Sequence, residues 1–447
     1  MKFKRSEKEP PSVSETTKQG GEARRQQFWP PAERAVWTDR MLEALVMGVK
    51  GGKWFSLMDK VYSRRNLEAA WKQVKRNRGA AGNDHISISK FQAEESKYLD
   101  NLGAELTSGS YQPRPVKRVM IPKPGTTERR PLGIPTVRDR IAQAAVRNVI
   151  EPIFEHRFHE HSYGFRPGRS CKDALRRVND LLRQGYLWVV DADIKSYFDT
   201  IDHDILMEEV RKVVADGRVL SLLRAFLEQD IMDGVAQWTP LRGSPQGAVI
   251  SPLLANIHLH PIDLALAASG IEFVRYADDL VLLCKSETAA MNALELLQGL
   301  MQKRKLTLHP DKTRVVDALN DPKGFDFLGY TFRKGHKWPR AKSFMRLKNR
   351  IRELTRRSGG KSLRNVVDVI NPVLRGWFEY FKHAGKTYFP RIDQWVRMRL
   401  RSILRFQQGR EGRGRGADHQ RWPNAFFAKY GLFTMTEARA AILSSPK

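Results

Sequence analysis

The chain has 447 residues, of which 41% are hydrophobic, so it is long enough for two or three domains with their own cores. Its 78 Lys and Arg outnumber 49 Asp and Glu, which gives a net charge of +29 at pH 7. Only two cysteines occur, Cys171 and Cys284, which excludes a disulfide framework and a cysteine-rich zinc site. No stretch approaches the ~18 uninterrupted apolar residues of a transmembrane helix, so we expect no membrane partner.

The positive charge is unevenly distributed. Residues 331–447 hold 28 Lys and Arg against 7 Asp and Glu, so the C-terminal quarter carries most of the excess. A basic surface interleaved with aromatic rings is typical of proteins that bind nucleic acid. A merely solubilising surface and a membrane surface are the alternatives. The interleaved aromatic residues are Trp338, Phe344, Trp377, Tyr380, Phe381, Trp395, Phe406 and Trp422.

In chain order, the predicted elements form three groups. The first 27 residues are polar and predict a disordered arm. Strands and helices alternate from about 115 to 335, which indicates an α+β domain. Its elements include a strand–turn–strand at 116–136, a helix at 137–155 and a hairpin at 273–283. After residue 340 the pattern predicts basic amphipathic helices at 341–357, 362–384 and 391–406, and then a glycine-rich linker at 409–420.

Two adjacent carboxylates, Asp278 and Asp279, interrupt the apolar predicted hairpin. Aspartate is common in turns, so an ordinary turn is one interpretation. Another apolar strand ends at Asp193, with Asp191 two residues earlier, and two strands of one sheet could bring Asp193 beside Asp278. Carboxylates that close repel one another, and a divalent cation with oxygen ligands, such as Mg²⁺, would remove the repulsion.

The motifs of the chain carry a family resemblance. Tyr-Ala-Asp-Asp at 276–279, Asp193 with Phe198 five residues later, and SPQGAVISPLLANI at 244–257 resemble reverse transcriptase core motifs. Further segments narrow the resemblance within the reverse transcriptases: IPKPG, RRPLGIPTVRDR, YGFRPGRS, FLGYTF and INPVLRGWFEYFK. Together they resemble the group II intron-encoded reverse transcriptase/maturase family, in the form that lacks a C-terminal endonuclease domain.

The resemblance implies an α+β right-hand polymerase of fingers and palm, followed by an all-helical thumb/maturase domain. The implied units are a flexible basic N-terminal extension at 1–60, fingers at 61–185, a palm at 186–338, the thumb at 339–408, and a basic linker with a DNA-binding-like region at 409–447.

Site residues are implied in the same way. Asp193, Asp278 and Asp279 would be the catalytic carboxylates and would bind two Mg²⁺ ions. Phe198 would be an aromatic gate that clashes with a 2′-hydroxyl, although core packing is its alternative role. The implied nucleotide-binding residues are Lys123, Arg130, Phe198, Gln246 and Lys312. The implied nucleic-acid-binding residues are Arg346, Lys348, Arg350, Arg375, Lys382, Arg397 and Arg401.

The implied activity is RNA-directed DNA synthesis, joined to binding and splicing of a group II intron RNA and to mobility by target-primed cDNA synthesis. The partners would be intron RNA, an RNA template with a DNA primer, target DNA and dNTPs. The protein would be cytoplasmic, of bacterial type, and associated with the nucleoid when on DNA. The alternatives are an RNA-binding splicing cofactor with secondary or lost polymerase activity, and a domesticated or CRISPR-linked reverse transcriptase.

Overall fold

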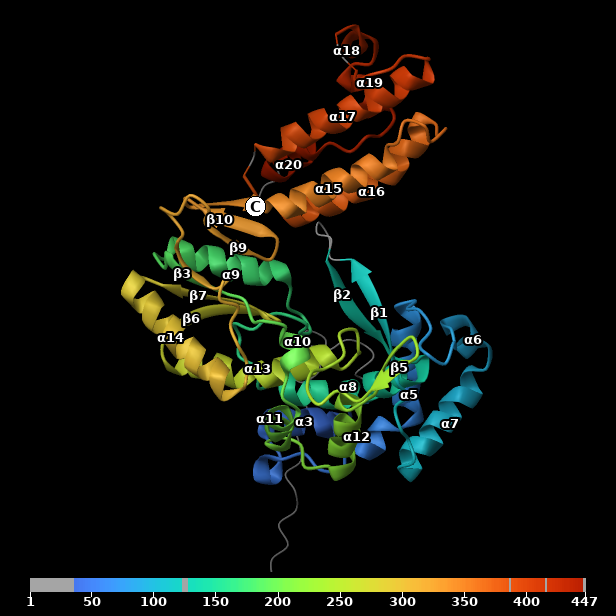
Figure 1. The fold of residues 1–447 in the computed structure, drawn as a ribbon, viewed down its shortest axis with the longest axis vertical. Coiled ribbons are helices and arrows are strands. Elements are labelled where there is room, and N and C mark those ends of the chain that lie inside the picture. The colour runs from blue at the N-terminus through green and yellow to red at the C-terminus, as the bar shows by residue number, and fades with distance from the viewer. Residues whose placement is uncertain (1–35, 123–127, 386, 415, 445–447) are drawn as a thin grey trace, which may run out of the picture.

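The computed structural model describes residues 36–122, 128–385, 387–414 and 416–444 (Figure 1). Within these ranges, helices cover a central palm sheet, a second sheet belongs to the fingers, and a small third sheet leads to a helical unit at the top of Figure 1. The predicted α+β right hand with a helical C-terminal domain is confirmed. None of the described helices combines the length and the apolar character needed to cross a membrane.

The palm sheet has strand order β6-β7-β3-β8, and all its neighbouring strands are antiparallel. The predicted hairpin is confirmed as β6 and β7, and it extends as a sheet because β7 pairs with β3. Both faces of this sheet are buried, since Val189 and Leu283 belong to one core and Val190 and Leu282 to another. The strands are β3 Trp188–Ala192, β6 Glu272–Tyr276, β7 Asp279–Cys284 and β8 Arg314–Asp317.

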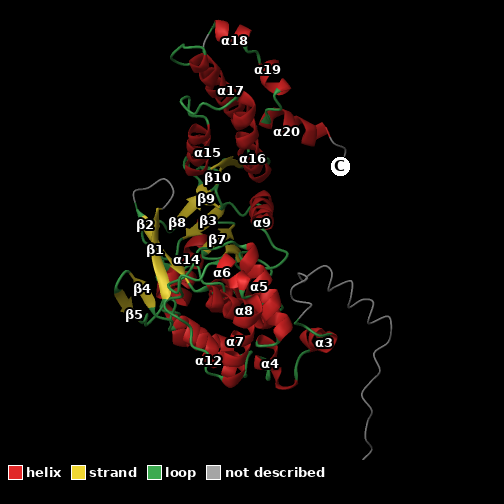
Figure 2. Cartoon of the chain, turned by 90° about the vertical axis from the view of Figure 1, so that its right-hand side faces the viewer, coloured by secondary structure: helices red, strands yellow, loops and turns green. Residues whose placement is uncertain are grey.

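Helices and a small sheet cover the two faces of the palm sheet. α13 (Ser251–Ala268) and α14 (Glu287–Lys303) lie on one face. The opposite face packs against α9 (Cys171–Arg183) and a three-stranded sheet of order β11-β10-β9. Figure 2 shows this layered arrangement from the side. The small sheet comprises β9 Phe325–Phe327, β10 Tyr330–Arg333 and β11 His336–Pro339.

The fingers sheet has strand order β2-β1-β4-β5. Its first two strands form the predicted antiparallel pair, but β4 and β5 come from within the segment that we expected to be palm. Beneath the sheet runs α8 (Val137–Glu155), which is almost wholly buried and is capped where Thr136 Oγ1 accepts from the Asp139 amide. The strands are β1 Val116–Pro122, β2 Arg129–Ile134, β4 Ile231–Asp233 and β5 Ala236–Trp238.

The N-terminal prediction requires a correction. Residues 1–35 of the predicted flexible extension lie outside the described residues, but residues 36–60 are folded. Trp37 is buried and its indole Nε1–H donates to the Asn148 carbonyl at 3.1 Å, and Leu57 is also buried. The prediction missed the amphipathic spacing of this segment. The helices near the fingers are α3 Asp39–Met47, η1 Lys50–Gly52, α4 Met58–Val61, α5 Arg64–Arg76, α6 Ile88–Ala93 and α7 Glu95–Ser108.

The helical unit has one core that runs to the end of the described chain. The helices α15 (Ala341–Leu354), α16 (Leu363–Phe381) and α17 (Tyr388–Gln407) form it as predicted. We predicted a separate region from residue 409, yet Trp422, Phe427 and Met435 are buried in the same core as these three helices. The remaining helices are α10 Tyr197–Thr200, α11 His203–Arg211, α12 Gly217–Leu227, α18 Ala417–Arg421, α19 Asn424–Lys429 and α20 Met435–Ser444.

Candidate active site

The candidate active site is built around the turn between β6 and β7. The last strand pair is Tyr276 with Asp279, so Ala277 and Asp278 alone form the turn. Ala277 has φ 59°, a left-handed value that costs a residue with a Cβ on the order of 1–3 kcal/mol. Asp278 therefore projects from a tight turn with a strained backbone, and the paired strands β6 and β7 hold this turn.

The palm register brings Asp193 to this turn. β3 pairs Ala192 with Leu280 of β7, so Asp193 follows directly beside the β6–β7 turn. Burial raises the pKa of Asp278 above its ordinary value, and the nearby Asp193 carboxylate raises it further. Desolvation also raises the pKa of Asp279 to about 6, with repulsion from Asp278, Asp193 and Asp191 adding to the effect. The negative charges predicted to gather here do influence one another.

The structure does not gather all three predicted carboxylates into one ligand set. Asp279 shares its face of β7 with Val281, which pairs with Asp191, whereas Asp278 lies in the turn. Across the described ranges, no three acidic, histidine or cysteine side chains are close enough together to hold a metal ion. Mg²⁺ is commonly held by one or two carboxylates plus substrate phosphates. The fit to a divalent cation therefore rests on Asp193 and Asp278. The pKa of Asp278 is raised first by burial and then by the Asp193 charge, and a bound cation would offset both effects.

A lysine occupies the exposed side of this carboxylate pair. The Lys312 ammonium Nζ lies 2.8 Å from Asp193 Oδ2. Backbone contacts fix the segment that carries it, because the His309 amide donates to the Asp193 carbonyl at 2.7 Å. The structure thus places the predicted Lys312 directly on a candidate metal ligand, where it partly neutralises the charge.

A cavity of about 220 Å³ brings Phe198 together with Gln246. Arg118, Trp238 and Arg242 contribute to the same cavity, and sequence reasoning missed all three. The guanidinium of Arg118 lies 5.6 Å from the Trp238 ring centroid, in a cation–π contact. The alternation of side chains along β1 could have predicted that Arg118 lines the cavity. The positions of Trp238 and Arg242 depend on the fold of residues 231–243, which the local sequence does not show. The remaining lining residues are Val116, Pro131, Gly133, Asp199, Ile231, Pro240, Gly243, Ser244 and Pro245.

The loop that carries Gln246 is tied to the segment that carries Phe198. The Ser244 amide donates to the Phe198 carbonyl, and the Gly243 amide donates to the Ile201 carbonyl, each at 2.7 Å. His203 Nε2 lies 2.7 Å from the Gly243 carbonyl and donates to it. Gly243 has φ 94°, and a Cβ there would lie 2.9 Å from the Phe198 carbonyl oxygen. Gly243 therefore permits the close approach that sets Phe198 beside Gln246.

The structure tests only one of the two cationic residues, Lys123 and Arg130, that were predicted to bind nucleotide from the fingers. Lys123 lies outside the described residues. Arg130 pairs with Ile121, whereas Arg118 pairs with Gly133. Because side chains alternate between the faces of a strand, Arg130 projects from the face opposite the one that lines the cavity. The structure therefore does not bring Arg130 into the cavity with Phe198 and Gln246.

The predicted nucleic-acid-binding residues of the helical unit fall into three groups. Arg346, Arg350 and Arg375 are exposed, and Lys348, Lys382 and Arg397 are half-buried. Arg401 is only 2% exposed, and its side chain donates to the Trp422 carbonyl and to Asn424 Oδ1. The prediction for Arg401 is wrong, because the returning C-terminal segment covers this residue.

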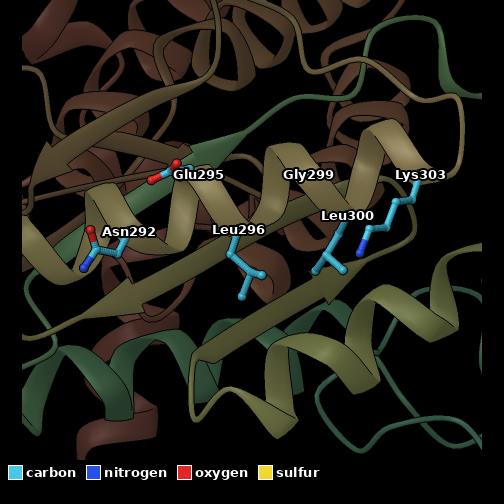
Figure 3. Close-up of a pocket in the computed structure, with 6 residues that line it drawn as sticks. All are labelled: Asn292, Glu295, Leu296, Gly299, Leu300 and Lys303. Atoms are coloured by element: carbon cyan, nitrogen blue, oxygen red, sulfur yellow. The ribbon is translucent and has the colours of Figure 1, made fainter.

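A larger cavity, of about 400 Å³, lies along α14 (Figure 3). Its lining comes entirely from α14, with Leu296 and Leu300 at its centre. None of the predicted site residues contributes to it. The candidate active site is therefore the carboxylate pair with the smaller cavity. The full lining of the larger one is Asn292, Glu295, Leu296, Gly299, Leu300 and Lys303.

Comparison with known proteins agrees with this geometry. Residues 121–332 match the reverse transcriptase (RNA-dependent DNA polymerase) family, and residues 344–422 match the group II intron maturase-specific domain. Protein YkfC of Escherichia coli is 38% identical over 288 residues, which are 56% of this chain and 74% of that protein. The group II intron-encoded protein LtrA of Lactococcus lactis is 35% identical over 206 residues, 46% of this chain and 34% of LtrA.

Among solved structures, the chain is similar to part of a Cas6-RT-Cas1–Cas2 complex, with 23% identity and a TM-score of 0.37 over 56% of this chain and 43% of that one. The two family matches lie in order along the chain and cover the palm strands and the helical unit. The greater part of YkfC is matched, whereas about a third of LtrA is. The chain belongs to the group II intron reverse transcriptase/maturase family.

Proposed function

We propose that the protein is an RNA-directed DNA polymerase that also binds a group II intron RNA, assists its splicing and supports its mobility by target-primed cDNA synthesis. The observation that carries the polymerase proposal is the meeting of Asp193 and Asp278 at adjoining strand ends. A structural role would not require two carboxylates to lie near each other, since that arrangement is unfavourable by itself.

Each residue of the site has a proposed task. Asp193 and Asp278 would hold two divalent cations, which, when bound, activate the primer 3′-hydroxyl and stabilise the leaving pyrophosphate. Lys312, which pairs with Asp193, would bind the leaving pyrophosphate through its ammonium group. Phe198 would exclude a 2′-hydroxyl, and Gln246 would contact the template beside the incoming dNTP. Lys123 would grip the triphosphate from the fingers, whereas Arg130 projects from the face of β2 opposite the cavity and is not assigned this task.

The helical unit supports the RNA-binding part of the proposal. Arg346, Arg350 and Arg375 are exposed on helices whose apolar faces are buried. Guanidinium groups suit phosphate oxygens, and phosphate contacts supply affinity without sequence choice. We assign Lys348, Lys382 and Arg397 to the same surface, and not Arg401.

A second candidate function is an RNA-binding splicing cofactor whose polymerase activity is secondary or lost. The observation in its favour is that the exposed cations of α15 and α16 lie outside the carboxylate site, so RNA binding does not depend on an active palm. Both activities can reside in one chain.

Primer extension on an RNA template, with Mg²⁺ and dNTPs, tests the proposal. We expect synthesis by the wild-type protein and none by Asp193→Asn or Asp278→Asn, with unchanged binding of the RNA–DNA duplex. The matched control is Asp204→Asn, an exposed carboxylate on α11. Tight RNA binding without synthesis by any of the proteins would favour the splicing cofactor.

A further inference from the structure

A buried arginine lies directly under the turn that carries Asp278. Arg275 of β6 is 1% exposed, and its partners Asp263 and Asn256 of α13 are 0% and 1% exposed. The guanidinium forms a two-pronged ion pair, with Nε 2.7 Å from Asp263 Oδ1 and Nη2 2.5 Å from Asp263 Oδ2. Two bonds to one carboxylate fix both the position and the plane of the guanidinium.

The remaining nitrogen of this guanidinium reaches the turn itself. Arg275 Nη1 donates to the Ala277 carbonyl and to Asn256 Oδ1, each at 2.9 Å. The Ala277 carbonyl belongs to the same planar peptide unit as the Asp278 amide. Holding this oxygen therefore holds the peptide plane from which the Asp278 side chain projects.

The turn is held from its other side by residues 161–164. The Arg275 amide donates to the His161 carbonyl at 3.0 Å, and the Tyr163 amide donates to the Arg275 carbonyl at 2.8 Å. A Cβ on Gly164 would lie 2.2 Å from the Ala277 nitrogen, so only glycine fits there. Asn256 connects the two sides, because its Nδ2 donates to the Gly164 carbonyl at 2.8 Å.

The turn needs such support. Ala277 adopts φ 59°, where two-residue hairpin turns normally place glycine or asparagine. Without a partner for its carbonyl, the Ala277–Asp278 peptide would be free to rotate toward a less strained conformation. A rotation of that kind would move the Asp278 carboxylate relative to Asp193 on the neighbouring strand.

We propose that Arg275, oriented by Asp263 and Asn256, is a positioning residue that fixes the Ala277–Asp278 peptide and with it the Asp278 carboxylate. The proposal rests on the proposed polymerase function for its kinetic consequence, but its structural consequence can be measured without activity. The competing view is that the buried ion pair only stabilises the fold, as many buried ion pairs are retained without a catalytic task.

Arg275→Lys separates the two views. Lysine can still pair with Asp263, so the buried carboxylate keeps a partner, but it lacks the planar fork that also reaches Ala277. Because a displacement of about 1 Å can cost on the order of 10²-fold in rate, we expect kcat for dNTP addition to fall by about that factor while KM for dNTP changes little. Arg177→Lys is the control, since Arg177 pairs with Glu272 at the far end of the same hairpin.

Asn256→Ala gives a second, milder variant. It leaves the Arg275–Asp263 ion pair intact but removes the links to Nη1 and to Gly164. We expect an intermediate loss of kcat, and the double variant with Arg275→Lys should lose less than the product of the two single losses, because both act through one turn.

Hydrogen exchange decides the proposal independently of activity. We expect Arg275→Lys to speed amide exchange in peptides that contain residues 277–279, while peptides from β3 and β8 keep their wild-type rates. Unchanged exchange at the turn, or an equal increase throughout the palm, would overturn the proposal even if the wild-type protein made no DNA. If the wild-type protein makes DNA and Arg275→Lys matches its kcat, the proposal is also overturned, while the proposed function stands.

Discussion

Asp278 and Asp279 are adjacent in sequence but have different surroundings. Burial and the charge of Asp193 raise the pKa of both. Asp278 lies in the turn, while Asp279 begins β7 on the face that it shares with Val281. The two carboxylates therefore should not contribute equally to catalysis.

We expect Asp278→Asn to lower the rate of dNTP addition by on the order of 10³-fold or more, because it removes a proposed cation ligand. Asp279→Asn should cost clearly less, because Asp279 shares no three-carboxylate set with Asp193 and Asp278. Single-turnover primer extension by the two variants measures the difference. Equal losses would show that both carboxylates bind the cations in the loaded enzyme.

Phe198 gives a prediction about sugar choice. Its ring lines the cavity with Gln246, and the Ser244 amide fixes its backbone. Phe198→Val should admit a 2′-hydroxyl and reduce discrimination against ribonucleotides by about 10- to 200-fold, the usual effect of one pocket contact. The ratio of kcat/KM for dNTP and rNTP measures it. If Phe198 serves only in core packing, the ratio will stay constant while the melting temperature falls.

His258 provides a prediction about pH. It is fully buried on α13, and desolvation lowers its pKa to about 4. Between about pH 6.5 and 4, the His258 imidazole is therefore protonated in the unfolded chain but neutral in the folded chain. The free energy of unfolding consequently falls as pH drops from about 6.5 toward 4. His258→Asn should remove roughly 1–3 kcal/mol of this acid sensitivity. The difference between variant and wild-type free energies of unfolding, at pH 7.5 and pH 5, tests this sign. A difference that does not change with pH would contradict it.

Sequence reasoning found the site residues that belong to short motifs and missed those that depend on distant folding. Asp193 and Asp278 lie in local patterns of strand and turn, whereas the expected role of Phe198 came from the family resemblance of its motif. Arg401 was wrongly assigned to nucleic-acid binding, because its burial depends on residues 422–424 returning to α17. A charge pattern along a helix does not show which cations a later segment will cover.

At the level of elements, pairing between segments distant in sequence also explains why only part of the fingers sheet was predicted. The β1–β2 hairpin is local and was predicted. β4 pairs in parallel with β1 across more than a hundred residues, from Val116 to Ile231. Parallel pairing needs a long crossover, which leaves no local pattern in the sequence.

A buried carboxylate helps to attach the final described helix to the helical unit. Buried Asp393 of α17 accepts from the Met435 and Thr436 amides and from the Thr436 hydroxyl, at 2.6–3.0 Å. These bonds cap the start of α20. Asp393→Ala should lower stability by about 2 kcal/mol, the upper range for a lost cap.

Chemical denaturation and amide exchange of residues 432–444 measure this effect. The control is Asp368→Ala, an exposed aspartate on α16. If α20 were an independent element, Asp393→Ala would leave exchange of these residues unchanged.

For the whole molecule, the charge of +29 predicts binding that depends steeply on salt. A protein that makes 6–10 phosphate contacts loses roughly 10³–10⁵ in affinity between 50 and 200 mM salt. Arg350→Gln should reduce the slope of log affinity against log salt by about 1, without changing the melting temperature. Arg401→Gln should do the reverse, because its side chain is buried.

Filter binding to an RNA–DNA duplex over a salt series measures both variants. A reduced salt slope for Arg401→Gln would show that the buried side chain is released on binding. An unchanged slope for Arg350→Gln would place the phosphate contacts on another face of the helical unit.

The two buried faces of the palm sheet bear on how this protein can change over evolution. Shifting β3 or β7 by one residue would move the side chains of that strand from one apolar core into the other, since side chains alternate with a period of two. Because both faces are buried, neither could accommodate side chains of a different size or polarity by turning them into solvent. Insertions and deletions of one residue should therefore be absent from these strands in any functional library, and new lengths should accumulate only in the segments that connect them.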